Sequence, residues 1–213
     1  MPLQNRVTPM GEIVAEPERG MFTGNRGIIH NPRTRTLLNR RWASPAWLIC
    51  VLQWRGIRRT VMGTRSWTEL FFLDEATALA AGHRPCFLCQ RAEAMAFQTS
   101  FPTRDRAARP KAPDIDRILH GERLNGRRKR LHDLTSPAVD LPDGAMIFQD
   151  GVPHLILSGQ AQRWSPRGYD VPTAPLDGAQ LITPPSTVAA LRAGYQPRLH
   201  ASAFGGSDPD ALP

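Results

Sequence analysis

Three cysteines constrain this 213-residue chain more than any other feature of its sequence. Cys86 and Cys89 form a Cys-x-x-Cys motif directly after a turn over residues 82–85, and Cys50 is the third thiol. An odd number of cysteines without a visible export signal argues against a disulfide framework and favours reduced thiols or a metal site. Two thiolates three residues apart at the start of a helix reach one tetrahedral Zn²⁺ at about 2.3 Å each. The motif therefore predicts that Cys86 and Cys89 bind a metal.

Two other interpretations of this motif stay open. A redox-active Cys-x-x-Cys normally follows a strand of a βαβ unit, and no such pattern precedes Cys86. Cysteine is also a small apolar side chain that packs well in a core, so Cys86 and Cys89 are alternatively structural residues.

The remaining metal ligands are candidates from other parts of the chain. Cys50 lies in an apolar segment that predicts a strand, and a sheet that brings this strand beside the Cys-x-x-Cys motif would add its thiol to the site. The fourth ligand is His30, in a His-Asn-Pro turn, or His83, three residues before Cys86; water and Asp are alternatives. Each histidine is alternatively a surface or capping residue.

Apolar and turn-forming residues predict the secondary structure. The segment WLICVLQW at 47–54 predicts a strand, and two further strands after it complete an antiparallel meander. Asp74 is an N-cap for the next helix, and Gly82 occupies the position after its C-cap. The elements expected in the first 130 residues are strands at 47–54, 57–62 and 67–73 and helices at 75–81, 89–98 and 115–124.

The C-terminal third predicts a small β-rich unit. An Asp-Gly turn at 150–151 joins two apolar segments, 145–148 and 154–157, into a hairpin. A short strand follows at 180–182. A helix capped by Thr183 then runs from 184 to 193 and is closed by Gly194.

The segment from Thr68 to Cys89, TELFFLDEATALAAGHRPCFLC, resembles the second half of the Ada-type metal-binding domain, a DNA methylphosphotriester repair domain. In that family a strand ending in Phe-Phe-Asp leads into an Ala-rich helix, which closes on Ala-Gly-aromatic-Arg-Pro-Cys-x-x-Cys. The match covers about 22 of the 213 residues. His83 stands where the family has an aromatic residue, and the family's second upstream cysteine has no counterpart here.

The resemblance implies a structural Zn²⁺ held by thiolates in a small domain that binds DNA. It also implies that Cys50 occupies the place of the upstream thiolate, which in the Ada protein accepts a methyl group from a DNA phosphotriester.

The predicted fold class is therefore α+β: a small Ada-like zinc domain, built of a β-meander and helices with the Cys-x-x-Cys motif at a helix start, followed by the β-rich unit. The expected divisions are an extended or loosely ordered lead-in (1–26), the Ada-like zinc-binding domain (27–101), a basic linker with a helical segment (102–140), the β-rich C-terminal unit (141–204) and a flexible tail (205–213).

Charge is concentrated in two segments. The net charge is +8; residues 1–65 hold eleven Arg against three Glu, and residues 104–130 hold ten basic against four acidic residues. Such segments favour a polyanionic partner, although an Arg-rich composition also follows from a GC-rich genome. The candidate nucleic-acid-binding residues are Arg40, Arg41, Arg58, Arg59, Arg127, Arg128, Lys129 and Arg130.

The sequence contains no P-loop, dinucleotide fingerprint or nucleophile elbow, so it gives no support to those enzyme classes. The longest uncharged apolar segment, 45–54, is half of the roughly 20 residues that a membrane span needs. We expect a cytoplasmic, zinc-binding, DNA-associated protein with RNA as an alternative partner and no membrane association. The alternatives are an enzyme acting on nucleic acid, through an alkyl-accepting Cys50 or a metal-assisted hydrolysis, and a zinc-stabilised protein-interaction module.

Overall fold

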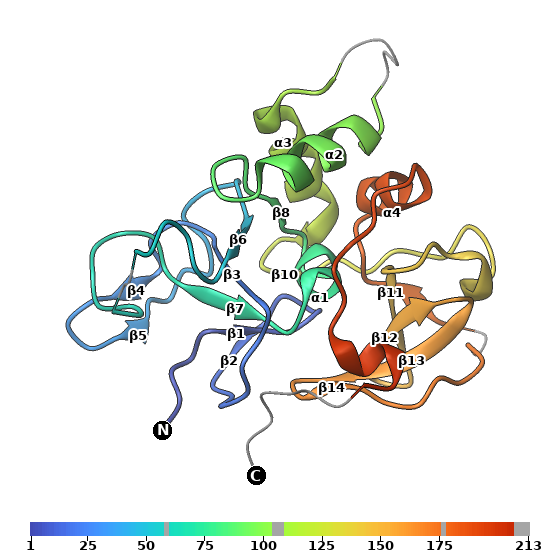
Figure 1. Cartoon of the computed structure of the whole chain (residues 1–213), viewed down its shortest axis with the longest axis horizontal. Coiled ribbons are helices and arrows are strands. Elements are labelled where there is room, and N and C mark those ends of the chain that lie inside the picture. Colours follow the sequence, from blue (N-terminus) through green and yellow to red (C-terminus); the bar gives the residue numbers. More distant parts are fainter. Residues whose placement is uncertain (58–59, 104–108, 176–177, 207–213) are drawn as a thin grey trace.

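Two β-sheets lie on either side of helix α1 (Glu75–Ala80) in the computed structural model, which describes residues 1–57, 60–103, 109–175 and 178–206 (Figure 1). All six residues of α1 are buried, and the helix contacts strand β7 of one sheet and strand β11 of the other. The presence of both helices and sheets confirms the α+β fold class.

The N-terminal sheet has six strands in the order β2-β1-β7-β3-β6-β8. Their bounds are β1 (Arg6–Val7), β2 (Ile13–Val14), β3 (Phe22–Asn25), β6 (Leu48–Val51), β7 (Leu70–Phe72) and β8 (Arg84–Pro85). β3 lies between β6 and β7 and pairs antiparallel with both. The expected meander is therefore wrong, because β3, and not a strand at 57–62, lies between the strands near 47–54 and 67–73.

Glycine explains why β3 occupies the middle of this sheet. A Cβ atom on Gly24 would lie 2.1 Å from the carbonyl oxygen of Leu48 and 2.8 Å from the ring of Phe72. Only glycine allows these neighbours to come so close, although glycine is a poor strand former in isolation. The N-terminal 26 residues, expected to be a lead-in, thus contribute β1, β2 and β3.

The segment expected to form a strand at 57–62 forms none in its described part, and residues 58 and 59 lie outside the described residues. The backbone N–H of Met62 donates to the Glu69 carboxylate at 2.9 Å, and that of Gly63 donates to the Thr60 carbonyl at 3.0 Å. These bonds close a loop. Two short antiparallel pairs complete this half: β4 (His30–Asn31) with β5 (Thr36–Leu37), and β9 (Leu124–Asn125) with β10 (Arg128–Lys129).

Helix α1 begins and ends as predicted. The Asp74 side chain accepts a hydrogen bond from the Thr77 N–H at 2.8 Å, and Gly82 after the C-cap has φ +91°. Helix α2 (Arg91–Ser100) is displaced by two residues from the predicted 89–98, and α3 (Ala112–Arg123) begins three residues before and ends one residue before the predicted 115–124.

The C-terminal sheet has the order β14-β13-β12-β11-β15. The predicted hairpin is present as β11 (Met146–Gln149) and β12 (Val152–Leu157), and β15 (Gln180–Leu181) matches the expected short strand. Two strands were not predicted, β13 (Gln160–Ser165) and β14 (Gly168–Tyr169). The Thr183 hydroxyl accepts a hydrogen bond from the Met146 N–H instead of capping α4 (Pro185–Arg192), whose N-cap is Pro184. The short 3₁₀ helices are η1 (Ala138–Asp140) and η2 (Ala201–Phe204).

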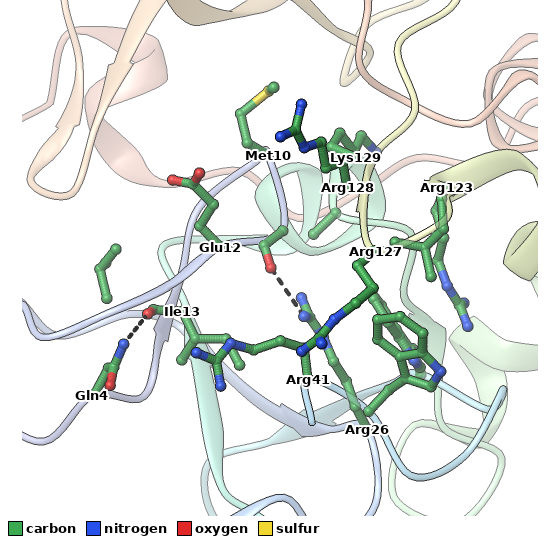
Figure 2. Close-up of a pocket in the computed structure, with 16 residues that line it drawn as sticks. Gln4, Met10, Glu12, Ile13, Arg26, Arg41, Arg123, Arg127, Arg128 and Lys129 are labelled. Atoms are coloured by element: carbon green, nitrogen blue, oxygen red, sulfur yellow. Dashed lines mark hydrogen bonds between the residues drawn. The ribbon is translucent and has the colours of Figure 1, made fainter. Parts of the chain in front are cut away.

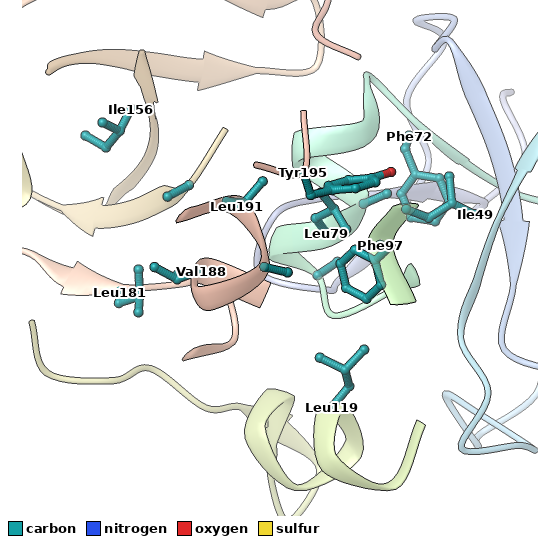
Figure 3. Packing of buried hydrophobic residues seen from close by; sticks show 14 of the residues in the cluster. Ile49, Phe72, Leu79, Phe97, Leu119, Ile156, Leu181, Val188, Leu191 and Tyr195 are labelled. Atoms are coloured by element: carbon teal, nitrogen blue, oxygen red, sulfur yellow. The ribbon is translucent and has the colours of Figure 1, made fainter. Parts of the chain in front are cut away.

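One hydrophobic core is shared by both sheets. It joins Ile49 and Phe72 of the N-terminal sheet to Ile156 and Leu181 of the C-terminal sheet through α1, α2, α3 and α4 (Figure 3). Within the ranges described, no helix is both long and apolar enough to cross a membrane.

Candidate metal centre

The three cysteines converge on one point at the edge of the N-terminal sheet. The sulfur atoms of Cys50, Cys86 and Cys89 all lie within 4.8 Å of one another. Cys50 belongs to β6, and the other two follow β8, which pairs parallel with β6. The register places Ile49 opposite Pro85, and the Cys86 N–H donates to the Ile49 carbonyl at 3.0 Å. Cys50 and Cys86 therefore lie side by side.

The turn that carries Cys86 and Cys89 is fixed by hydrogen bonds. The Leu88 N–H points at the Cys86 sulfur at 3.4 Å, a geometry that stabilises a thiolate. Gln90 donates its backbone N–H to the Cys86 carbonyl and its side-chain amide to the Ile49 carbonyl, both at 2.9 Å. Buried Gln90 thus ties the turn to β6 and holds the three sulfurs in place.

The three thiols are hydrogen-bonded to one another. The Cys50 and Cys89 thiols donate hydrogen bonds to the Cys86 sulfur, and these bonds lower the pKa of Cys86 to about 2. The same contacts, together with burial, raise the pKa of Cys50 far above its usual range. A divalent cation among the sulfurs reverses this arrangement, since its charge favours a thiolate at every ligand.

Neither candidate histidine lies with the cysteines. His30 makes hydrogen bonds to the Thr68 hydroxyl at 2.6 Å and to the Thr64 carbonyl at 2.9 Å. His83 is fully buried against the rings of Trp47 and Phe72, and its Nε2 accepts a hydrogen bond from Arg26. In the part of the chain that the structure describes, the metal-compatible group consists of the three cysteines alone.

A cavity of about 430 Å³ adjoins the sulfurs. Its wall includes the apolar side chains of Trp54, Trp67 and Leu88 and the buried carboxylate of Glu69. One carboxylate oxygen, Oε1, has no hydrogen-bond partner among the described residues. The cavity gives space for a fourth ligand that is not a side chain, such as water.

The two basic segments of the sequence meet on another part of the surface. The Arg127 guanidinium donates to the Asn39 carbonyl at 2.7 Å, and Arg40, Arg41 and Arg127 line a common hollow of about 270 Å³. Arg128 and Lys129 form β10 beside them, and Arg130 is exposed. Arg58 and Arg59 lie outside the described residues.

Sequence reasoning missed Arg26 and Trp47, which line a cavity together with Arg123, Arg127 and Lys129. No local signal distinguishes an arginine that becomes buried from an exposed one. No protein-family model, curated protein or solved structure matches this chain.

Proposed function

We propose that this chain is a zinc-binding, nucleic-acid-associated protein in which Cys50, Cys86 and Cys89 hold a structural Zn²⁺. The observation that carries the proposal is the convergence of three sulfur atoms within 4.8 Å, from β6 and from the turn before α2. Two thiolates on one tetrahedral Zn²⁺ are about 3.8 Å apart, given bonds of about 2.3 Å, so the spacing suits this ion.

The donor set also favours zinc. Thiolates select Zn²⁺ over the hard cations Mg²⁺ and Ca²⁺, which prefer oxygen ligands. A reducing cytoplasm, which we propose as the location of the protein, keeps thiols available for such a site. Bound Zn²⁺ would cross-link β6 to the start of α2, two segments that backbone hydrogen bonds already join. Water completes the coordination sphere from the adjoining cavity.

The partner that we propose is DNA, with RNA as the alternative. Support comes from the convergence of Arg40 and Arg41 with Arg127 and Arg128, from segments far apart in the chain, on one surface. Arginine suits phosphate contacts because its planar guanidinium group can donate two parallel N–H hydrogen bonds to two oxygens of one phosphate. The resemblance of residues 68–89 to a DNA-binding zinc domain points in the same direction.

Elemental analysis of the purified protein tests the metal site. We expect about one zinc ion per chain in the wild type, and less than about 0.2 in Cys50→Ser and Cys86→Ser. His30→Gln serves as the control and retains the metal, because His30 is engaged by Thr68 and Thr64. Zinc-free wild type, or serine variants that keep their zinc, would overturn the proposal.

Salt-dependent DNA binding tests the partner. The logarithm of the affinity should fall linearly with the logarithm of the salt concentration, and the double variant Arg127→Gln/Arg128→Gln should lower that slope by about 2. Arg163→Gln, an exposed arginine of β13, is the matched control and should keep the wild-type slope. A salt-independent affinity would rule out phosphate contacts.

The cavity beside the sulfurs favours one second candidate, an alkyl-accepting enzyme. Cys50 lines this cavity, so an alkyl phosphotriester placed there could pass its alkyl group to the Cys50 thiolate. A carbon–sulfur bond would form, the carbon–oxygen bond would break, and a phosphodiester would leave. Transfer of label from alkyl-labelled phosphotriester DNA to wild type but not to Cys50→Ser supports this candidate, and an unlabelled wild type removes it.

A further inference from the structure

Two buried arginines lie over the same tryptophan ring. The guanidinium carbons of Arg26 and Arg123 are 3.8 Å and 3.9 Å from the ring of Trp47. Each arginine is 1 % exposed, and Trp47 is 2 % exposed. Cation–π contacts favour this arrangement, but they do not neutralise two like charges placed so close together.

Each of the two buried arginines has one N–H group that makes no hydrogen bond to a described residue. Arg26 donates to the Gly11 carbonyl at 2.9 Å and to His83, whereas its buried Nη2 has no partner among the described residues. Arg123 donates to the Gly82 carbonyl at 2.9 Å, and its buried Nε is likewise unpartnered. The Lys129 ammonium donates to the Ala80 carbonyl at 2.5 Å. Every one of these protein acceptors is neutral.

These groups line a cavity of about 660 Å³, a size typical of ligand sites. Figure 2 shows side chains of both basic segments around it. Its lining includes six cations: Arg26, Arg41, Arg123, Arg127, Arg128 and Lys129. Exposed Glu12 is the one acid among the lining residues, and none of the ion pairs found between described residues involves any of the six cations.

Burial and the neighbouring positive charges destabilise the charged forms of these cations. Burial, with Arg123 and Arg26 nearby, lowers the pKa of Lys129 to about 7. Burial also lowers the pKa of Arg123 to about 9, although Asp116 acts in the opposite direction. Buried charges without a counterion are costly, and native proteins pair them or bind a ligand of opposite charge. An anion in the cavity would offset this cost.

We propose that this cavity binds the phosphate group of an organic phosphate, with the free donor of Arg26 and the ammonium of Lys129 contacting its oxygens. The neighbouring hollow of about 270 Å³ shares Arg41, Trp42 and Arg127 with the cavity and gives room for the rest of the ligand. Such a phosphate is carried by a free phosphorylated metabolite or by the 5′ end of a nucleic-acid strand. The site does not depend on the metal centre, but it shares Arg41, Arg127 and Arg128 with the nucleic-acid surface proposed above.

Titration calorimetry on the full chain tests this site with three probes: pyrophosphate, a 5′-phosphorylated oligonucleotide and the same oligonucleotide with a 5′-hydroxyl. Lys129→Met should weaken pyrophosphate binding by about tenfold or more, because it removes a charge-assisted hydrogen bond. Arg41→Gln should weaken it as well, because it removes one of the cations that line the cavity. Arg163→Gln, outside the cavity, should bind as the wild type does.

Lys129→Met also separates lost binding from lost folding. The pKa of Lys129 in the folded protein lies below its usual value of 10.5, so the charged ammonium lowers the stability of the fold at pH 6. Methionine carries no charge and does not lower the stability in this way. We therefore expect the ligand-free variant to be at least as stable as the wild type while its stabilisation by pyrophosphate falls.

The probes identify the source of the phosphate. Preference for the 5′-phosphorylated over the 5′-hydroxyl strand assigns the site to strand ends, and binding of pyrophosphate without that preference assigns it to a free phosphorylated molecule. Either result supports the site. It is overturned if no probe binds at up to about 10 mM, or if Lys129→Met and Arg41→Gln bind pyrophosphate as tightly as the wild type.

Discussion

Cys50 and Cys86 are neighbours across two parallel strands, one residue beyond the pairing of Ile49 with Pro85. Parallel strands need a long crossover connection, and here the chain between them supplies β7 and the buried helix α1. The cluster of three cysteines is thus a product of the sheet order. Any change that separates β8 from β6 would separate the thiols.

Gly82 is required for the position of Arg123. It has φ +91°, and a Cβ atom there would lie 2.5 Å from the Arg123 Cδ. We predict that Gly82→Ala lowers the free energy of unfolding by about 2–4 kcal/mol and weakens pyrophosphate binding, because Arg123 must move.

Gly151→Ala is the matched control for this prediction. Gly151 has a similar φ of +81°, but a Cβ atom at this position would have no neighbour within 4 Å, so only the backbone strain of about 1–2 kcal/mol applies. Equal losses of stability in urea unfolding of the two variants would show that Arg123 does not depend on Gly82.

Tyr169 ties the C-terminal sheet to the start of α1. Its hydroxyl donates to buried Asp74 at 2.9 Å, and the His200 N–H donates to the same carboxylate oxygen at 3.1 Å. Tyr169→Phe should lower the free energy of unfolding by about 1.5–3 kcal/mol, the range for a hydrogen bond to a charged group. Urea unfolding measures this loss. The same substitution should cost less in an Asp74→Asn background; an equal cost there would mean that the two groups are not coupled.

Lys129 should make anion binding depend on pH. Its native pKa of about 7 leaves the amine mostly neutral at pH 8, and a bound dianion favours the protonated form. The other charged groups lining the cavity are Glu12, Arg26, Arg41, Arg123, Arg127 and Arg128. Sulfate, which stays a dianion throughout this range, should bind more weakly as the pH rises from about 7 to about 9.

The number of protons that the protein takes up when sulfate binds can be measured. Calorimetry at pH 8 in two buffers with different ionisation enthalpies should report uptake of close to one proton per sulfate bound in the wild type, and much less in Lys129→Met. Uptake that is the same in both proteins would assign the proton to another group.

Capping and turn residues in the sequence predicted those helices and strands whose ends are fixed by residues next to them in the chain. Asp74 and Gly82 delimit α1, and the turn at Asp150-Gly151 aligns β11 with β12. β3 escaped prediction because Gly24 weakens its strand propensity, whereas the close approach of β6 and β7 that requires this glycine is a tertiary property. A strand inserted from the N-terminus then changed the expected meander into a mixed sheet.

Local sequence signals likewise predicted one part of the candidate sites and not the other. The Cys-x-x-Cys spacing carries its own chemistry, and Cys50 is the third thiol in the chain, so the cluster of three cysteines could be inferred from the sequence. The cavity of about 660 Å³ could not be predicted from the sequence. Its lining combines residues of α3 and β10 with the segments around Met10 and around buried Trp47, which are far apart in the chain. His83, a candidate ligand by spacing, packs instead between the rings of Trp47 and Phe72.

X-ray absorption at the zinc edge counts the sulfur atoms bound to the metal in the purified protein, and so tests whether the three cysteines hold one ion. We expect three sulfurs at about 2.3 Å and one oxygen or nitrogen at about 2.0 Å. A first shell with two sulfurs or fewer would contradict this expectation, because Cys50, Cys86 and Cys89 would then not all share one ion.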